Sequence, residues 1–221
     1  MTAFGAAMIE TVNGTPQTCD LADGGIIACR DYVALRAEER ALLDRIAPLT
    51  AGPVLDIGCG IGRHLAYLRR KALPDLLLLG AEICDRMRGH CSRTIPAPAR
   101  FDADWRALVS GHRLGLVLLM GNGLGALGDE AAARRGLAYL ADALRPGGRL
   151  LVETGNPFAP HGYTTRRFSL SWGGQVDRFP WGHAAQAWIE NELVPRGLTV
   201  TIHASSAPPG RGWFIAEAVR A

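Results

Sequence analysis

The sequence predicts an α/β protein with a seven-stranded, mostly parallel sheet and helices on both of its faces. Segments with strand character alternate with helix-like segments along most of the 221 residues, an order typical of parallel sheets. Three strand segments, 54–57, 76–82 and 114–120, are nearly unbroken apolar runs, as expected for strands that are buried on both faces. The first of these runs leads into a glycine-rich turn and a helix-like stretch, a combination that often binds nucleotide-like ligands.

The N-terminal part of the chain contains one clear helix. Residues 1–30 are rich in Gly, Thr and Ala and show no clear periodicity. From Tyr32 to Ile46 apolar residues recur at helical spacing, and Pro48 is expected to end this helix.

From residue 54 onward, strands and helices alternate. The expected strands lie at 54–57, 76–82, 100–102, 114–120, 149–154, 198–204 and 213–219. The expected helices lie at about 62–72, 85–94, 129–144 and 183–194. Pro146-Gly147-Gly148 reads as a tight turn before the fifth strand, and 155–182 is a long irregular insertion. Because no linker or repeat interrupts this order, residues 1–221 are expected to form a single domain.

Composition points to a cytoplasmic globular protein without a nucleic-acid or membrane partner. Hydrophobic residues make up 48% of the chain and charged residues 20%, as in globular rather than disordered proteins. The net charge is only +3, Lys71 is the only lysine and the arginine runs are short, so a nucleic-acid footprint is not expected. No apolar stretch approaches the roughly 20 residues that cross a bilayer, and no signal peptide is expected.

The cysteines favour free thiols over disulfides or a metal site. They number five, an odd count, and form no Cys-x-x-Cys pair. Cys84, His90 and Cys91 could gather around a metal, but their spacing matches no zinc pattern. We therefore expect no metal. Cys59 stands in the glycine turn, where the geometry needs a small side chain, and no nucleophilic role is expected for it.

Residues 53–64, Pro-Val-Leu-Asp-Ile-Gly-Cys-Gly-Ile-Gly-Arg-His, carry the strongest functional signal. Their glycines let the backbone turn sharply and let a ligand approach the main chain, and the helix that follows directs free N–H groups at that ligand. The usual dinucleotide fingerprint is Gly-x-Gly-x-x-Gly, whereas this turn reads Asp-x-Gly-x-Gly-x-Gly from Asp56. The acidic residue would repel the phosphates of a dinucleotide and suits a ligand that carries an ammonium group.

This pattern resembles motif I of the class I S-adenosylmethionine (SAM)-dependent methyltransferases, whose fold is a Rossmann-like seven-stranded sheet. The resemblance covers residues 30–155 well and the last strands only by pattern. Residues 116–153 look like small-molecule methyltransferases of bacterial secondary metabolism. The sequence has Gly115 where the family often has an aspartate at the start of the fourth strand. It also lacks the Asn-Pro-Pro-Tyr type of motif, which argues against DNA bases and glutamine side chains as acceptors.

The resemblance implies a SAM site at the carboxyl ends of the strands. In the glycine turn it involves Asp56, Gly58, Cys59 and Gly60. Glu82, at the end of the second strand, would accept hydrogen bonds from the ribose hydroxyls, and Ile83 would pack on the adenine ring.

The remaining cofactor residues come from three further segments. Asp104 with the backbone of Trp105 is favoured for the adenine, Asp102 with Ala103 is the alternative, and Trp105 could instead be ordinary core. Met120, Gly121 and Asn122 would line the methionine part of SAM. Tyr32 and Arg36 open the first helix, a region that closes over SAM in similar proteins and can bind its carboxylate.

The methyl acceptor is expected between the N-terminal lid, 1–48, and the insertion, 155–182. The insertion concentrates aromatic, histidine and arginine residues, which could line a pocket for a flat or anionic small molecule. Alternatively, Phe168, Leu170 and Trp172 could alternate along a hairpin that packs on the sheet. The sequence leaves both possibilities open.

Three histidines are candidates for a role in the site. His161, close after the fifth strand, is the best candidate for a general base. His183 is expected to start a helix, and His64 to support the cofactor loop.

The predicted function is SAM-dependent methyl transfer to O or N of a small molecule, a natural-product intermediate, with S-adenosylhomocysteine (SAH) as product. Alternatives are a peptide or RNA acceptor, a SAM-binding protein without methyltransferase activity, and a non-methylating use of the sulfonium. Retention of Gly58, Gly60 and Glu82 argues against the second alternative. The sequence indicates neither the acceptor nor the oligomeric state.

Overall fold

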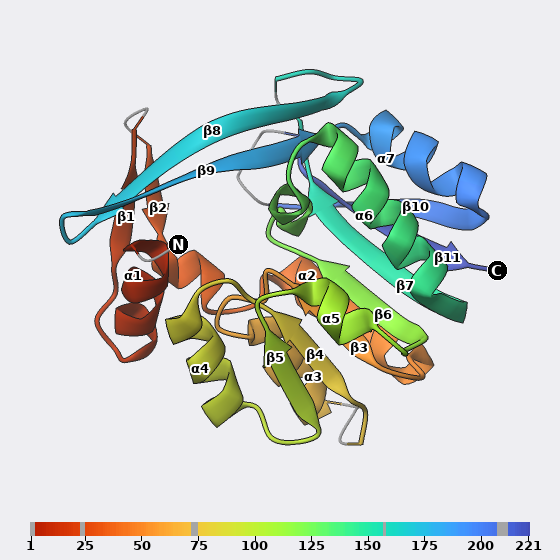
Figure 1. Ribbon diagram of the computed structural model, residues 1–221, viewed down its shortest axis with the longest axis horizontal. Coiled ribbons are helices and arrows are strands. Elements are labelled where there is room, and N and C mark those ends of the chain that lie inside the picture. Colours follow the sequence, from red (N-terminus) through yellow and green to blue (C-terminus); the bar gives the residue numbers. More distant parts are fainter. Residues whose placement is uncertain (1–2, 23–24, 72–74, 157, 207–211) are drawn as a thin grey trace.

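The computed structural model describes residues 3–22, 25–71, 75–156, 158–206 and 212–221. Its main sheet has seven strands in the order β10-β11-β7-β6-β3-β4-β5 (Figure 1). The strands are β3 Val54–Ile57, β4 Leu78–Ala81, β5 Ala99–Asp102, β6 Leu114–Leu119, β7 Leu144–Thr154, β10 Leu198–Ala204 and β11 Phe214–Arg220. Strands β7, β6, β3, β4 and β5 pair in parallel, and β11 is antiparallel to β7 and β10. The predicted seven-stranded, mostly parallel sheet is confirmed.

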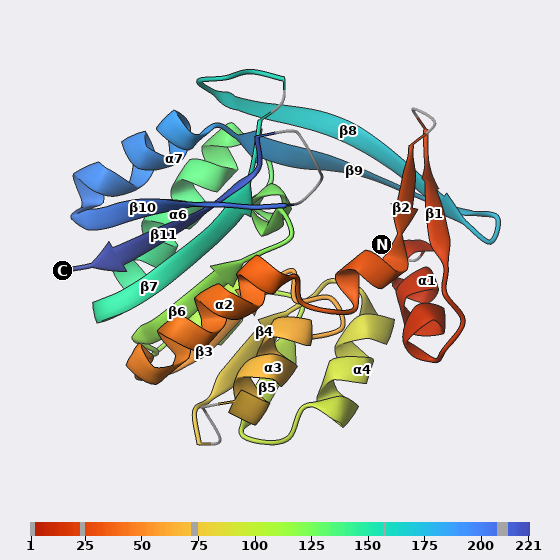
Figure 2. The same ribbon diagram turned by 180° about the vertical axis from the view of Figure 1, so that it is seen from behind.

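Helices cover both faces of this sheet, as Figures 1 and 2 show from opposite sides. One face carries α5 Trp105–Val109, α6 Glu130–Ala143 and α7 Gln186–Leu193, and the other carries α2 Ala37–Ile46 and α3 Arg63–Lys71. Along β3, Leu55 and Ile57 pack with the first set and Val54 with the second, because successive side chains of a strand point to opposite faces. All four residues of β3 are therefore buried.

A second, four-stranded sheet joins the N-terminal segment to the insertion. Its order is β2-β1-β8-β9, from β1 Thr18–Leu21, β2 Ile26–Ala28, β8 Tyr163–Trp172 and β9 Gln175–Ala184. The β8–β9 hairpin reaches from the main sheet across to β1 and β2 (Figure 1). Its turn is Gly173-Gly174, and both glycines have positive φ, as a tight two-residue hairpin requires.

The N-terminal elements were not predicted from the sequence. Helix α1 (Ala3–Val12) packs between the second sheet and α4 (Asp85–Thr94). A Cβ on Gly5 would lie 2.2 Å from Sγ of Cys84, so the two helices approach closely at this point. A helix this short depends on tertiary packing for its stability, which is why local periodicity did not reveal it.

Two predicted helices differ in the structure. The helix expected over 32–46 is divided into a 3₁₀ turn, Cys29–Tyr32, and α2, which begins at Ala37. The prediction that a helix starts at 183 was wrong. Strand β9 continues to Ala184, His183 pairs with Thr164 of β8, and α7 begins at Gln186. Three further 3₁₀ turns span Ala47–Leu49, Gly123–Leu127 and Val194–Arg196.

The Pro146-Gly147-Gly148 turn lies within β7, which begins five residues earlier than the expected strand, at Leu144. Gly147 has φ +72°, and the pairing of β7 with β6 shifts register between Leu114 and Leu116. The turn residues thus form an irregularity at the start of the strand instead of preceding it.

Candidate functional site

A cavity of about 660 Å³ opens at the carboxyl ends of β3, β4, β5 and β6 and extends under the β8–β9 hairpin. Its volume lies within the range of about 300–1,000 Å³ that is typical of ligand pockets. Of the residues that the motifs assigned to the cofactor, those that line the cavity are Tyr32, Arg36, Gly58, Cys59, Gly60, Glu82, Ile83, Asp104, Trp105, Met120, Gly121 and Asn122. Asp56 is buried and does not reach the cavity surface.

The glycine turn presents bare backbone to the cavity. Gly58 and Gly60 have φ of +72° and +58°, and a Cβ at either position would meet no protein atom within 4 Å. The backbone N–H groups of Gly58 and Cys59 donate to the carbonyl of Ala81 at 2.8 and 3.0 Å. The turn is therefore tied to the end of β4, while its glycines leave room for a ligand.

Glu82 follows β4 directly and is 6% exposed. Its two carboxylate oxygens accept the backbone N–H groups of Gly60 at 2.9 Å and Cys84 at 2.8 Å. Burial raises the pKa of Glu82, and these two hydrogen bonds act in the opposite direction. Because a carboxylate can accept about four hydrogen bonds, the oxygens keep acceptor capacity toward the cavity.

The ends of β4 and β5 give the cavity an apolar and an acidic side chain. Ile83 is 61% exposed although it is a large apolar residue, and the exposed side chain belongs to the cavity lining. Asp104 caps α5 by accepting the N–H of Arg106 at 2.9 Å. Trp105 lines the cavity and also belongs to the core, at 8% exposure. Asp102, the alternative acid, does not line the cavity; its carboxylate accepts the N–H of Asp104.

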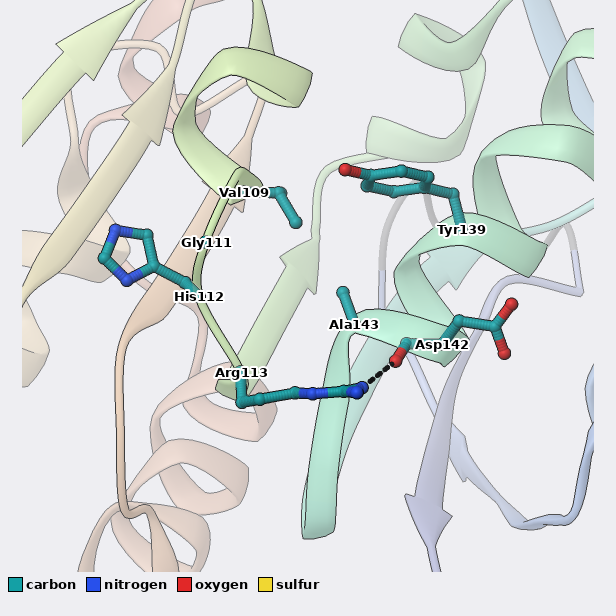
Figure 3. Close-up of a pocket in the computed structure, with 7 residues that line it drawn as sticks. All are labelled: Val109, Gly111, His112, Arg113, Tyr139, Asp142 and Ala143. Atoms are coloured by element: carbon teal, nitrogen blue, oxygen red, sulfur yellow. Dashed lines mark hydrogen bonds between the residues drawn. The ribbon is translucent and has the colours of Figure 1, made fainter.

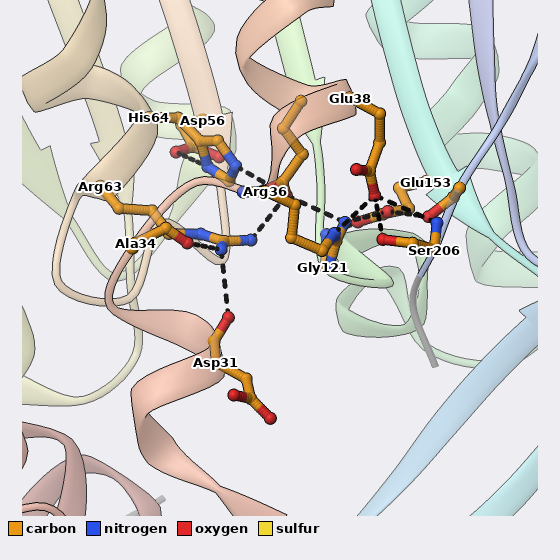
Figure 4. Close-up of polar contacts among 12 residues, drawn as sticks. Asp31, Ala34, Arg36, Glu38, Asp56, Arg63, His64, Gly121, Glu153 and Ser206 are labelled. Atoms are coloured by element: carbon orange, nitrogen blue, oxygen red, sulfur yellow. Dashed lines mark hydrogen bonds and ion pairs between the residues drawn. The ribbon is translucent and has the colours of Figure 1, made fainter. Parts of the chain in front are cut away.

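A network of buried charges joins α2, α3 and β7 beside the glycine turn (Figure 4). Glu39, fully buried, accepts hydrogen bonds from Nη2 of Arg36 at 3.0 Å and Nη2 of Arg63 at 2.7 Å. Arg36 also contacts the carboxylates of Glu38 and Glu153. Its guanidinium lines the cavity but is already held by three carboxylates, so it is positioned rather than freely mobile.

Asp56 connects to the same network through a histidine. His64 lies 3.3 Å from Asp56 through Nδ1 and 3.4 Å from Glu39 through Nε2. Burial by itself lowers the pKa of His64, but Asp56 and Glu39 hold this pKa above its ordinary value. These two carboxylates therefore favour the protonated form of His64, whose side chain also belongs to the cavity lining.

Arg63, Glu39 and Glu153 were not predicted as site residues from the sequence. Two local signals were available: Glu39 stands three residues after the Arg36 N-cap, in capping-box spacing, and Glu153 lies near the carboxyl end of a buried strand. These side chains come together only through contacts between residues far apart in the chain, such as Arg36 and Glu153.

Asn122 anchors the loop after β6. It adopts the left-handed conformation with φ +61° and is buried. Its Oδ1 accepts the hydroxyl of Thr154 at 2.9 Å, and its Nδ2 donates to the carbonyl of Gly182 at 3.2 Å. This single side chain therefore joins the ends of β6, β7 and β9, and places His183 beside the cavity.

An aromatic wall, defined as Phe168, Phe179, Trp181, His183 and Trp213, lines the cavity; the first four residues belong to the β8–β9 hairpin and Trp213 directly precedes β11. The rings of Phe168 and Phe179 stack with centroids 6.2 Å apart, and Phe179 meets Trp181 edge-on at 5.4 Å. A Cβ on Gly125 would lie 2.4 Å from Nε1 of Trp181, so glycine is needed for this indole to pack on the loop after β6. The insertion is a hairpin, as the second expectation had it, but it pairs into the second sheet instead of packing on the main one; Phe168 and Leu170 line the cavity, whereas Trp172 packs beside α1.

The predicted base, His161, lies in the exposed turn before β8 and is not part of the cavity lining. The histidine that the hairpin brings to the cavity is His183. The cavity lining thus includes His183 and not His161, whose role as a base stays a prediction.

A second hollow, of about 440 Å³, lies near the start of β6 and the end of α6 (Figure 3). Arg113 there donates to the carbonyl of Asp142 at 2.7 Å. None of the predicted site residues lines it, so we assign no function to it.

Within the described residues, no group of three His, Cys, Asp or Glu side chains is arranged to hold a metal ion. The five cysteines are free and buried. In the described part of the chain, no helix has the length and apolar character that crossing a membrane requires.

No protein-family model matches the chain. The chain is 30% identical over 124 residues to dTDP-3-amino-3,4,6-trideoxy-α-D-glucopyranose N,N-dimethyltransferase of Streptomyces venezuelae. That match covers 56% of this chain and spans about half, 51%, of the relative's length.

Solved structures are similar over more of the chain. The SAM-bound amino pentose methyltransferase CalS10 of Micromonospora echinaspora, involved in calicheamicin biosynthesis, superposes with a TM-score of 0.57 at 22% identity, covering 83% of this chain and 91% of that one. A SAM-dependent methyltransferase of Bacteroides fragilis in complex with SAH gives a TM-score of 0.73 at 14% identity, covering 99% and 95% of the two chains. The chain thus has the fold of the class I SAM-dependent methyltransferases and resembles in sequence a sugar N,N-dimethyltransferase.

Proposed function

We propose that this chain is a methyltransferase that binds SAM at the ends of β3–β6 and methylates O or N of a small molecule. One observation carries the proposal. Residues that the methyltransferase motifs assign to the cofactor come from widely separated segments of the sequence, and all but Asp56 line one cavity. If the glycine turn had only a structural role, the other motif residues would not need to line the same cavity.

When bound, SAM supplies a methyl group that its sulfonium has already activated. The protein then has to hold it, align the acceptor and exclude water. In this proposal Glu82 receives the ribose hydroxyls, and Ile83, Asp104 and Trp105 surround the adenine. The methionine end is assigned to Tyr32, Arg36, Gly58, Cys59, Gly60, Met120, Gly121 and Asn122. Asp56 acts indirectly, by holding His64.

The relatives support a small-molecule acceptor from bacterial secondary metabolism. Two of them are named for amino sugars, in one case within the biosynthesis of calicheamicin. The aromatic wall along the hairpin also favours a small organic molecule, because it offers apolar ring surfaces rather than a basic face for RNA.

Residues 1–221 would act as one domain, with 1–48 and 155–182 closing the cavity on its acceptor side. A cytoplasmic location is part of the proposal. The cysteines are free thiols in the structure, as expected in a reducing compartment.

Titration calorimetry of the purified protein with SAM and SAH tests the cofactor assignment. We expect micromolar binding of both. Glu82→Gln removes the charge and should weaken SAH binding tenfold or more, equal to about 1.4 kcal/mol. Glu10→Gln, the same change at an exposed position outside the cavity, is the matched control. No binding of either ligand to the wild type would refute the proposed function, and equal affinities of the two variants would refute the ribose assignment.

A further inference from the structure

His183 is a buried histidine with one unsatisfied nitrogen. It lies on β9 at 5% exposure, and its Nδ1 is 3.2 Å from the carbonyl oxygen of Gly155. Its Nε2 is buried and has no hydrogen-bond partner among the described residues. An unsatisfied buried polar atom is costly and calls for a functional reason.

The surrounding hydrogen bonds determine which nitrogen carries the proton. A carbonyl oxygen can only accept, so Nδ1 of His183 donates to Gly155 and Nε2 keeps a free lone pair. Nδ2 of Asn122 also lies 3.5 Å from Nδ1 of His183 and has a second N–H, but the shorter 3.2 Å contact with the Gly155 carbonyl, which would repel an unprotonated Nδ1, favours the proton on Nδ1. Thr154 in turn accepts the N–H of Ala184 at 3.2 Å. The ring is thus held in place as a neutral proton acceptor.

Aromatic rings surround His183, and no acidic side chain among the described residues shifts its pKa. Rings of Phe158, Phe168 and Trp213 have centroids 5.4, 5.8 and 6.1 Å from its own. Burial lowers the pKa of His183, the hydrogen bond to Gly155 opposes this effect, and the Arg166 cation on β8 lowers the pKa further. The imidazole is therefore neutral at pH 7 and available as a base.

We propose that Nε2 of His183 accepts the proton of the methyl acceptor, and that this acceptor is an apolar ring compound with a phenol-type hydroxyl group. This inference rests on the proposed function and deepens it. No residue of the aromatic wall is acidic; the acidic cavity residues, Glu82 and Asp104, follow β4 and β5. An ammonium group placed beside His183 would meet the Arg166 cation and no carboxylate, whereas a neutral hydroxyl needs only the free lone pair.

Because Nε2 is buried, the rings around His183 have to move for an acceptor to reach it. Phe168 and Trp213 belong to the cavity lining and flank His183, with centroids 5.8 and 6.1 Å from its own. An acceptor ring that enters from the cavity would stack against these two side chains and direct its hydroxyl at Nε2.

The step balances without any further reactant. The acceptor oxygen forms a bond to the methyl carbon, the carbon–sulfur bond breaks with its electron pair going to sulfur, and the hydroxyl proton passes to Nε2. His183 leaves the step as an imidazolium and returns the proton to solvent.

Nuclear magnetic resonance of the histidine nitrogens tests the proposal without relying on turnover. The SAH-loaded protein is titrated with 4-ethylphenol, and with phenethylamine and glucosamine as the amine and sugar alternatives. We expect His183 to carry its proton on Nδ1 and to titrate below the ordinary histidine range. We also expect 4-ethylphenol alone to bind and to move the Nε2 resonance toward its protonated position.

Variants give a second readout. His183→Asn keeps an N–H donor toward Gly155 and removes Nε2, and it should lower transfer of labelled methyl to 4-ethylphenol about 100-fold while SAH affinity stays unchanged. His112→Asn, in the second hollow, is the control and should be unaffected. His161→Asn tests in the same assay whether the exposed histidine contributes to methyl transfer.

The inference is overturned if His183 carries its proton on Nε2, or if 4-ethylphenol fails to bind or binds without moving that resonance. It is also overturned if glucosamine or phenethylamine moves the resonance instead, or if His161→Asn lowers methyl transfer and His183→Asn does not. SAH binding measured on the same samples separates the two proposals. Its loss in the wild type refutes the proposed function, whereas intact SAH binding with any of these outcomes refutes this inference alone.

Discussion

Replacing Glu39 by Gln should destabilise the protein strongly, because this carboxylate is a buried member of the network of Figure 4. Glu39 is fully buried and receives the backbone N–H of Arg36 at 2.7 Å, the guanidinium groups of Arg36 and Arg63, and Nε2 of His64. Glutamine keeps the shape but turns an N–H₂ group toward donors, and it removes the negative charge. The side chain of Arg63, only 7% exposed, would then lack a carboxylate partner.

The magnitude follows from burial. Breaking a buried ion pair by removing one partner costs about 3–5 kcal/mol. The adjacent Glu38 pairs with the same arginine, but its side chain is 27% exposed. Glu38→Gln should therefore cost about 1 kcal/mol or less, as partly solvated pairs do, and it serves as the matched control one residue away.

Urea unfolding of the wild type and the two variants measures the difference. We expect Glu39→Gln to lower the midpoint strongly at an unchanged denaturant slope, and Glu38→Gln to lower it slightly. Because Arg36, Arg63 and His64 line the cavity, SAH affinity should fall with Glu39→Gln as well. Equal losses in the two variants, or a loss below about 1 kcal/mol for Glu39→Gln, would refute the reasoning that burial makes this carboxylate the centre of the network.

Two further predictions concern the cavity. Gly125→Ala places a Cβ 2.4 Å from Nε1 of Trp181, so the indole has to move. We expect altered tryptophan fluorescence and weaker 4-ethylphenol binding, with SAH affinity preserved. An unchanged fluorescence spectrum would contradict this prediction. The pKa of His64 is raised because Asp56 and Glu39 outweigh burial, so its stabilising contribution is complete below the unfolded pKa of about 6.5 and is lost as pH rises through the folded value. The stability difference between wild type and His64→Gln should therefore be larger at pH 6 than at pH 9 in urea unfolding, and the opposite order would contradict the assignment.

The main sheet could be predicted from the sequence because the burial pattern of each strand is visible in a few consecutive residues. A strand that is buried on both faces has to be apolar at nearly every position, and β3, β4 and β6 are buried at every residue. The glycine turn was equally readable, since positive φ at Gly58 and Gly60 demands glycine whatever the rest of the chain does. The cofactor side of the cavity follows from these two features, because parallel strands end at one edge of a sheet.

The acceptor side could not be predicted in the same way. Helix α1, β1 and β2 carry little periodicity and depend on packing against α4 and the β8–β9 hairpin. His183 is far from the glycine turn in the sequence, and it reaches the cavity only because β9 pairs with β8 in a register that opposes His183 to Thr164.

The sequence by itself thus determined the fold class and the place of the cofactor motif, both of which rest on short-range burial patterns and backbone geometry. The tertiary structure decided which histidine of the insertion region lines the cavity and which carboxylates hold Arg36, including Glu153, 117 residues away. The physical reason is that a side chain's hydrogen-bond partners and exposure are set by long-range contacts. His161 and His183 are the same residue type in the same insertion region, and only the pairing of the hairpin exposes one and buries the other.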